Sequence, residues 1–160
     1  MNRTDFLGKS SYDGCVGCGI ISGDFCVPNG FIYENNSFVL HQDPEFPIET
    51  FFIITSKRHF KYLYEMTDLE YIDYTDILRV SRTILNKINR TKEYTIITEE
   101  RSNHFHTWMF PRLEWMEGFS RSLSDIRNIM NYSRNNMIEK NNIENVVNMV
   151  EKAKQIIKCL

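Results

Sequence analysis

The segment Thr50-Phe-Phe-Ile-Ile-Thr55 constrains the fold more than any other part of the sequence. It consists of aromatic and β-branched residues, which are the residue types that strands favour. Successive side chains of a strand point to opposite faces, and this run is apolar on both. Pro44 and Pro47 interrupt regular structure shortly before it. We therefore expect a central strand that is buried on both faces.

Four other segments show strand patterns, so that the predicted strands in chain order are 31–34, 37–41, 50–55, 94–98 and 104–110. The first two are expected to form a hairpin that turns at Asn35-Asn36. The last two are separated by the short polar turn from Glu99 to Asn103 and should pair antiparallel. Pro111 ends the last strand.

The clearest helix is predicted over residues 68–88, where Thr67 or Asp68 can cap its start and apolar residues recur at helical spacing. Beyond Arg112 we expect two more helices, one after Ser124 and one over about 142–158. The fold class is therefore α+β: an antiparallel sheet of about five strands, the 68–88 helix on one face and the C-terminal helices packed beside it. We expect one domain over 1–160, with a core at 15–112 and a helical extension at 113–160.

Composition excludes several classes of protein. With 42% hydrophobic residues and a formal net charge of -2, the chain is neither disordered nor a polycation that would hold nucleic acid by charge. We see no apolar run of the roughly 18 residues that a membrane span needs, and no signal peptide, so a cytoplasmic protein without a membrane partner is expected. In that reducing compartment the four cysteines are not expected to form disulfides.

Histidines alternate along the last predicted strand. His104, His106 and Trp108 should share one face of it, because side chains alternate between faces. A neutral imidazole can attack phosphorus, accept a proton or bind a metal. An isolated His-x-His is more often a pair of partly exposed strand histidines, so the surrounding sequence has to decide between these interpretations.

That surrounding sequence contains Cys15-Val-Gly-Cys18, the hairpin, Lys57-Arg58-His59 after an apolar strand, and a histidine strand that ends in Pro111-Arg112. In this combination the chain resembles the histidine-triad (HIT) family of nucleotide hydrolases and transferases. The resemblance covers approximately residues 15–112. It implies a homodimer whose strands are continuous across the interface.

By this resemblance His106 is the nucleophile, since it matches the middle histidine of the family pattern and would attack the α-phosphate of a nucleotide. A covalent nucleotidyl-histidine would form and then pass its nucleotide to water or another acceptor. Two positions depart from the pattern: the third histidine is Trp108, and a further family histidine is Phe51. The N–H of an indole can donate a hydrogen bond, but it cannot act as a general acid at neutral pH. The family's uridylyltransferase branch nevertheless works with glutamine at the third position.

The resemblance also implies a zinc site. In bacterial members with an N-terminal CxxC, the corresponding ligands are Cys15, Cys18, His59 and His104. Four protein ligands leave no open position, so this zinc would be structural and would hold the N-terminal segment against the histidine strand. The alternative is two ordinary buried thiols and a surface histidine at 59. His41 is expected to be a packed residue.

For the nucleotide, the resemblance assigns the ribose hydroxyls to Asp43, although an Asp before Pro44 could equally begin a turn. In the turn before the histidine strand, Ser102 and Asn103 are the best candidates for hydrogen-bond donors to the phosphates. Arg101 could offset the negative charge of the two glutamates in this turn. Trp108 could bind a phosphate oxygen or stack on a base. Arg112 could reach phosphate, but an exposed surface position is more common for such a residue.

We therefore predict a hydrolase or nucleotidyltransferase that acts on a nucleoside phosphoramidate, a dinucleoside polyphosphate or a related purine nucleotide through His106. One alternative is a non-catalytic nucleotide-binding protein with the same zinc site. A second is a zinc hydrolase, which would need one of the four proposed ligands to leave the metal.

Overall fold

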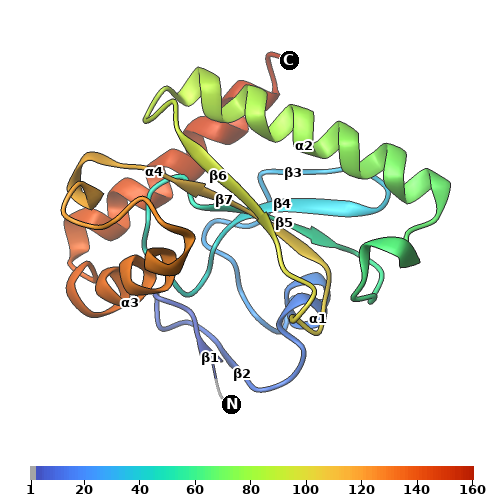
Figure 1. Ribbon diagram of the computed structural model, residues 1–160, viewed down its shortest axis with the longest axis horizontal. Helices are drawn as coiled ribbons and strands as arrows, with labels where there is room; N and C mark the ends of the chain where they lie inside the picture. Colours follow the sequence, from blue (N-terminus) through green and yellow to red (C-terminus); the bar gives the residue numbers. More distant parts are fainter. Residues whose placement is uncertain (1–2) are drawn as a thin grey trace.

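A five-stranded antiparallel sheet with the strand order β3-β4-β5-β7-β6 forms the centre of the computed structural model, which describes residues 3–160 (Figure 1). Its strands are β3 (Tyr33–Glu34), β4 (Phe38–Gln42), β5 (Phe52–Ser56), β6 (Tyr94–Thr98) and β7 (His106–Pro111). This confirms the α+β class, the antiparallel sheet of about five strands and both predicted strand pairings.

The central position of β5 explains the apolar run that precedes and forms it. All five residues of β5 are buried. Ile54 joins a core cluster on one face of the sheet and Ile53 joins a second cluster on the other face. The strand begins at Phe52 and not at Thr50, because Thr50 adopts a left-handed conformation with φ of 61° in the preceding turn.

Helix α2 (Asp68–Ile88) has the predicted bounds. The Thr67 hydroxyl accepts a hydrogen bond from the backbone N–H of Glu70, and the Glu70 carboxylate accepts one from the backbone N–H of Thr67. Asn89 ends the helix in the left-handed conformation. Its apolar side covers one face of the sheet, and α4 (Lys140–Ile157) packs beside it. None of the helices in residues 3–160 combines the length and hydropathy that a membrane crossing requires.

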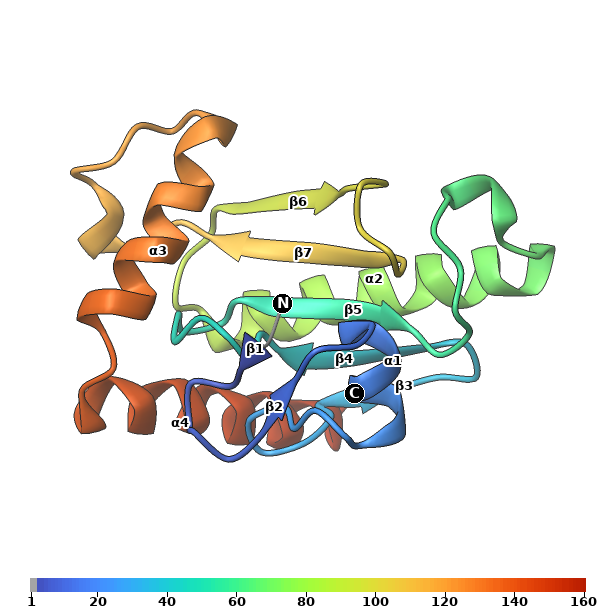
Figure 2. The ribbon, with the colours of Figure 1, turned by 90° about the horizontal axis from the view of Figure 1, so that it is seen from below.

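The opposite face carries two smaller helices at its two ends, α1 (Val16–Ser22) and α3 (Ile126–Asn136) (Figures 1 and 2). The C-terminal extension therefore contacts both faces of the sheet, with α4 on one side and α3 on the other. The remaining elements are short: β1 (Arg3–Thr4) pairs with β2 (Ser11–Tyr12), and single 3-10 turns occur at η1 (Leu63–Glu65), η2 (Glu114–Met116) and η3 (Leu123–Asp125).

Two local features differ from the prediction. The CxxC segment, for which no helix was predicted, is helical: Cys15 is the N-cap of α1 and Cys18 lies within that helix. Gly17, which lies between them, allows the backbone of α1 to approach His104 closely, because a Cβ atom at this position would overlap the imidazole of His104. The histidine strand begins at His106, two residues later than predicted, because the Phe105 N–H donates to the carbonyl of Phe60 at 2.7 Å and leaves the ladder.

Candidate functional site

Four potential metal donors converge at the N-terminal end of α1. The donor atoms of Cys15, Cys18, His59 and His104 all lie within 4.8 Å of one another. Sγ of Cys15 is 3.6 Å from Nδ1 of His59 and 3.4 Å from Nδ1 of His104, and the corresponding distances from Sγ of Cys18 are 3.1 Å and 3.6 Å. Tetrahedral zinc with bonds of about 2.3 Å to sulfur and 2.0 Å to nitrogen places such ligands roughly 3.5 Å apart.

The hydrogen bond on the far side of the His104 ring fixes the tautomer that a metal needs. Nε2 of His104 lies 2.8 Å from the carbonyl oxygen of Ser56, which can only accept, so Nε2 carries the proton. Nδ1 then presents its lone pair to the two cysteines. Burial lowers the pKa of His104, which also favours the neutral ring. The donor set, its spacing and this tautomer together fit zinc.

His106 is the first residue of β7 and faces a different space from His104. Its Nδ1 lies 3.0 Å from the backbone carbonyl oxygen of His104 and must donate to it, which leaves a lone pair on Nε2. Burial lowers the pKa of His106, so its imidazole is neutral at pH 7. A neutral, oriented imidazole is suited to nucleophilic attack.

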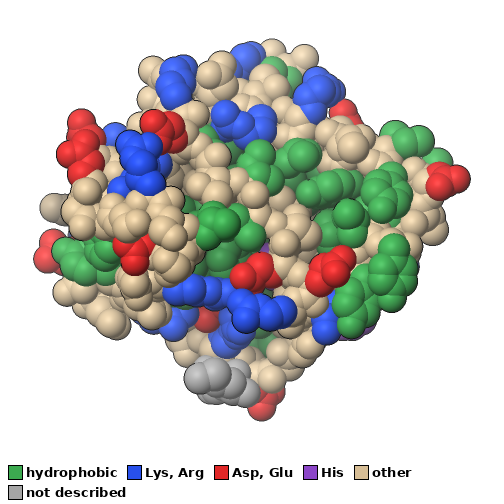
Figure 3. Space-filling model, in the orientation of Figure 1, with side chains coloured by type: hydrophobic (Ala, Val, Ile, Leu, Met, Phe, Trp, Pro, Cys, Tyr) green, Lys and Arg blue, Asp and Glu red, His purple; other side chains and the backbone are tan. Residues whose placement is uncertain are grey.

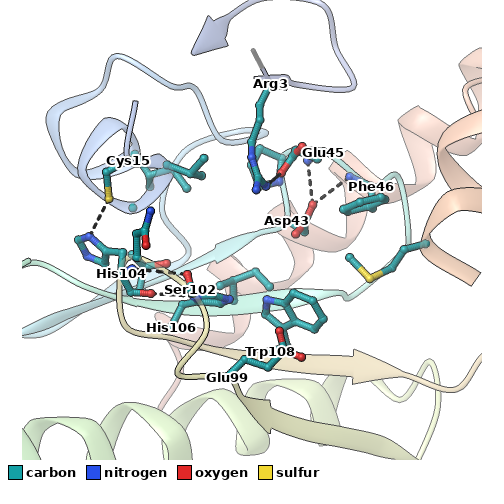
Figure 4. Close-up of a pocket in the computed structure, with 18 of the residues that line it drawn as sticks. Arg3, Cys15, Asp43, Glu45, Phe46, Glu99, Ser102, His104, His106 and Trp108 are labelled. Carbon is teal, nitrogen blue, oxygen red and sulfur yellow. Dashed lines mark hydrogen bonds and ion pairs between the residues drawn. The ribbon is translucent and has the colours of Figure 1, made fainter. Parts of the chain in front are cut away.

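His106 lines a cavity of about 650 Å³ between α1 and α3, and so do six more of the nine predicted site residues: Cys15, Asp43, Ser102, Asn103, His104 and Trp108 (Figure 4). The other two, Cys18 and His59, belong only to the cluster of metal donors. The predicted site residues therefore form two adjacent groups in the structure, the cavity lining and the metal cluster, and Cys15 and His104 belong to both.

Several solved structures with a similar fold are histidine triad proteins. A Zn-bound histidine triad family protein from Mycobacterium smegmatis matches with 17% identity over 92% of this chain and 98% of that one, with a TM-score of 0.61. A hypothetical histidine triad nucleotide-binding protein from Sulfolobus tokodaii matches with 16% identity over 90% and 94%, with a TM-score of 0.63. A HIT family member from Bacillus subtilis matches with 19% identity over 78% and 97%, with a TM-score of 0.57.

The chain has the histidine-triad fold. No family model matches the sequence, and no curated protein matches it. The identities to the solved structures are low, so these structures establish the fold, and the chemistry has to be argued from the residues of this chain.

Phe51 and Trp108, the two positions at which the sequence resemblance is incomplete, contact each other. The ring centroids of Phe51 and Trp108 are 5.8 Å apart, edge to face. Phe51 is fully buried, and Trp108 lies on the cavity floor next to His106, with their ring centroids 5.8 Å apart. Phe51 and Trp108 therefore form a packed aromatic pair beside His106.

Asp43 occupies a position that fits both roles that the sequence left open, the start of a turn and a ligand-binding residue. Its Oδ1 accepts the backbone N–H groups of Glu45 and Phe46, as expected of an aspartate that starts a turn, and the same side chain lines the cavity. Burial, reinforced by the charge of Glu45, raises the pKa of Asp43 to about 7. At neutral pH the carboxyl group therefore exists in both protonation states.

His41 is buried, as expected, but it also lines the cavity. Its Nδ1 lies 2.8 Å from the carbonyl oxygen of Gln42, and its Nε2 lies 2.9 Å from the hydroxyl of Thr55. Burial lowers the pKa of His41 to about 4, so the ring is neutral under ordinary conditions.

The wall that α3 contributes to the cavity was not predicted from the sequence. Arg127, Met130, Asn131 and Arg134 all line the cavity, and their spacing along the helix places them on one face. That spacing was visible in the sequence, but the resemblance ended before it. Arg112, by contrast, points its Nη atoms at the backbone carbonyls of Phe119 and Ser120 and does not line the cavity.

Proposed function

We propose that this protein is a nucleotide-phosphate hydrolase or nucleotidyltransferase that works through a covalent nucleotidyl-histidine at His106. The observation that carries the proposal is the hydrogen bond from Nδ1 of His106 to the carbonyl of His104. It fixes the tautomer that leaves the lone pair on Nε2, and His106 lines a cavity large enough for a nucleotide. The similarity to HIT proteins at the level of fold supports the same assignment.

In this reaction Nε2 attacks the α-phosphorus of the nucleotide. A nitrogen–phosphorus bond forms while the bond to the leaving group breaks, and water or another acceptor then displaces His106 and releases the nucleoside monophosphate or its transfer product. The substrates to be tested are purine nucleoside phosphoramidates and dinucleoside polyphosphates.

Binding of the nucleotide is assigned to residues that line the cavity. Asp43 would hold the ribose hydroxyls, and Ser102 and Asn103 would donate to phosphate oxygens. Trp108 would contact the phosphate or the base. Glu99, which seemed unfavourable for a polyphosphate, is neutralised by Arg101 at 3.4 Å and by Arg127 at 3.0 Å.

Zinc, held by Cys15, Cys18, His59 and His104, would have a structural role. All four positions of a tetrahedral ion are then filled by the protein, and His106 lines the cavity without being part of this cluster. When bound, zinc would fix α1 against the segment that leads into β7. Thiolate ligands require reduced cysteines, which agrees with a cytoplasmic location.

We also propose a homodimer in which β6 pairs with its counterpart. β6 is an edge strand with exposed residues, including Ile96. Hydrophobic side chains gather near it over η1 and the start of α2, on the right of Figure 3, where Tyr64, Leu69 and Ile72 are exposed. A second copy would cover this apolar surface.

The second candidate is a nucleotide-binding protein without turnover, and it is favoured by Trp108, which cannot deliver a proton to a leaving group. Calorimetric titration with AMP, combined with an assay of AMP release, separates the two. We expect AMP to bind to both the wild-type protein and His106→Ala, and only the wild-type protein to release AMP from a substrate. Binding to both proteins with turnover by neither would establish the second candidate.

A further inference from the structure

Because Trp108 cannot protonate a leaving group, the chemical nature of the leaving group determines whether the reaction can proceed. When His106 displaces an amine from phosphorus, the amine has to take up a proton as the bond breaks. When it displaces a phosphate, the leaving oxygen is stable as an anion at neutral pH and needs compensation of its charge. The side chains around Trp108 therefore bear on the class of substrate.

Arg127 lies over Trp108. The guanidinium carbon is 4.7 Å from the centre of the indole ring, so that the cation stacks on its face. With Phe51 against one side of the indole and Arg127 against another, Trp108 is fixed in place and fixes the cation in turn. The position that carries a histidine in the family pattern is thus occupied by an indole with a permanent cation on it.

The orientation of Arg127 is defined by one ion pair. Its Nη2 donates to Oε2 of Glu99 at 3.0 Å, and among residues 3–160 Glu99 is the only hydrogen-bond acceptor of this guanidinium. A guanidinium has five N–H donors in a fixed fork. Its other donors are free for oxygen atoms in the cavity, which Arg127 lines together with His106.

Two more cations line the same cavity in a similar manner. Glu45 pairs with Arg3 at 2.6 Å and with Arg134 at 3.1 Å, and the Arg134 guanidinium also stacks on Phe46 at 4.2 Å. Within the described part of the chain, residues 3–160, Arg3 and Arg134 each retain donors without a hydrogen-bond partner, and such forks match phosphate oxygens. An extended anion would find cations along this wall, whereas an amine that carries a positive charge would be repelled.

We propose that Arg127 is a catalytic residue that stabilises an anionic leaving group, so that the enzyme cleaves phosphoanhydrides, such as dinucleoside polyphosphates, in preference to phosphoramidates. This inference rests on the proposed function. Nε2 of His106 forms a bond to the α-phosphorus while the bond to the bridging oxygen breaks, and its electron pair goes to the departing phosphate. Arg127 donates hydrogen bonds to that phosphate and transfers no proton. Water then adds to phosphorus, His106 regains its electron pair, and a proton is released to solvent.

The test compares diadenosine triphosphate with adenosine 5′-phosphoramidate on zinc-loaded protein. We expect the wild-type protein to prefer the anhydride. Arg127→Met should lower kcat for the anhydride roughly 100-fold, as loss of a donor to a developing anion does elsewhere, and lower kcat for the phosphoramidate far less. Arg121→Met is the matched control, because Arg121 also forms an arginine–glutamate pair, with Glu93, but does not line this cavity.

A second variant tests the same idea in the opposite direction. Trp108→His would introduce a group that can deliver a proton, and should raise phosphoramidate turnover by up to roughly 100-fold without a similar gain for the anhydride. Zinc content and melting temperature show whether each variant is folded.

Equal losses for the two substrates in Arg127→Met, or a wild-type preference for the phosphoramidate, would overturn this inference and leave the proposed function standing. Absence of turnover of either substrate, together with absence of a covalent adduct, would overturn both.

Discussion

The side chains at the two ends of the cavity are positioned by different interactions. At the α1 end, four side chains direct their donor atoms to one point, and the segments that carry them are distant in sequence. At the α3 end, arginines are positioned by carboxylates and aromatic faces, with side chains about half exposed, as for Arg127 and Arg134. The α1 end should therefore determine stability, and the α3 end should determine which ligands the cavity accepts.

The largest effect is expected from loss of the metal. Cys18→Ala should abolish stoichiometric zinc binding and lower the free energy of unfolding by roughly 3 kcal/mol or more, because zinc binding is coupled to folding. Zinc analysis and chemical denaturation measure both effects. Cys26→Ala is the control, since Cys26 is exposed and outside the cluster. If Cys18→Ala were as stable as the control, the α1 end would not depend on a metal.

A smaller loss should follow from Gly17→Ala. The added methyl group would overlap the His104 ring, and either α1 or the ring must move, which we expect to cost about 2 kcal/mol and to weaken zinc binding. Gly118→Ala is the matched control, because a Cβ at Gly118 meets no atom within 4 Å. Equal denaturation midpoints for the two variants would show that α1 does not press on His104.

The raised pKa of Asp43, which lines the cavity, should make the stability of the protein depend on pH. Its pKa is raised from 3.8 to about 7 in the folded state, so the folded protein holds more protons than the unfolded chain between these values, and this group's contribution to stability falls as pH rises through them. Asp43→Asn removes that slope. We therefore expect the variant to gain stability relative to the wild-type protein as pH rises from 4 to 7.

His41 should oppose Asp43. Its pKa falls from 6.5 to about 4 on folding, so its contribution is complete above pH 6.5 and is lost as pH falls towards 4. Denaturation of the wild-type protein, Asp43→Asn and His41→Asn across this range gives each contribution as the difference in stability between the wild-type protein and the variant. Differences that change with pH in the same direction for the two variants would contradict the burial-based assignment.

The smallest effect on stability is expected at the α3 end. Arg134→Met should lower the free energy of unfolding by less than about 1 kcal/mol, because pairs between partly exposed charges contribute little. Arg79→Met, which removes an exposed pair with Asp76, gives the baseline. A loss as large as that of Cys18→Ala would remove the distinction between the two ends.

The sequence predicted the α1 end better than the α3 end. The resemblance to HIT proteins assigned Cys15, Cys18, His59 and His104 to zinc, and the fold brings their donor atoms together. Helix α2 follows from its own periodicity and capping residues. The arginines of α3 lie beyond the part of the chain that the resemblance covers. Their role depends on how residues 113–160 pack on the sheet, which is a tertiary property.

The local errors have the same origin. α1 was missed because seven residues with two glycines have little helical propensity, and the helix is held in place by packing against His104 and Tyr12. The start of β7 depends on a hydrogen bond between Phe105 and Phe60, which are far apart in sequence.

The central claim, that His106 is a nucleophile, is tested most directly by intact mass spectrometry under conditions that preserve an acid-labile phosphorus–nitrogen bond. Zinc-loaded protein is mixed with diadenosine triphosphate and, separately, with adenosine 5′-phosphoramidate, with His106→Ala alongside. The account predicts a transient AMP adduct on the wild-type protein and none on the variant. An adduct of equal yield on His106→Ala, or AMP release by that variant at the wild-type rate, would contradict it.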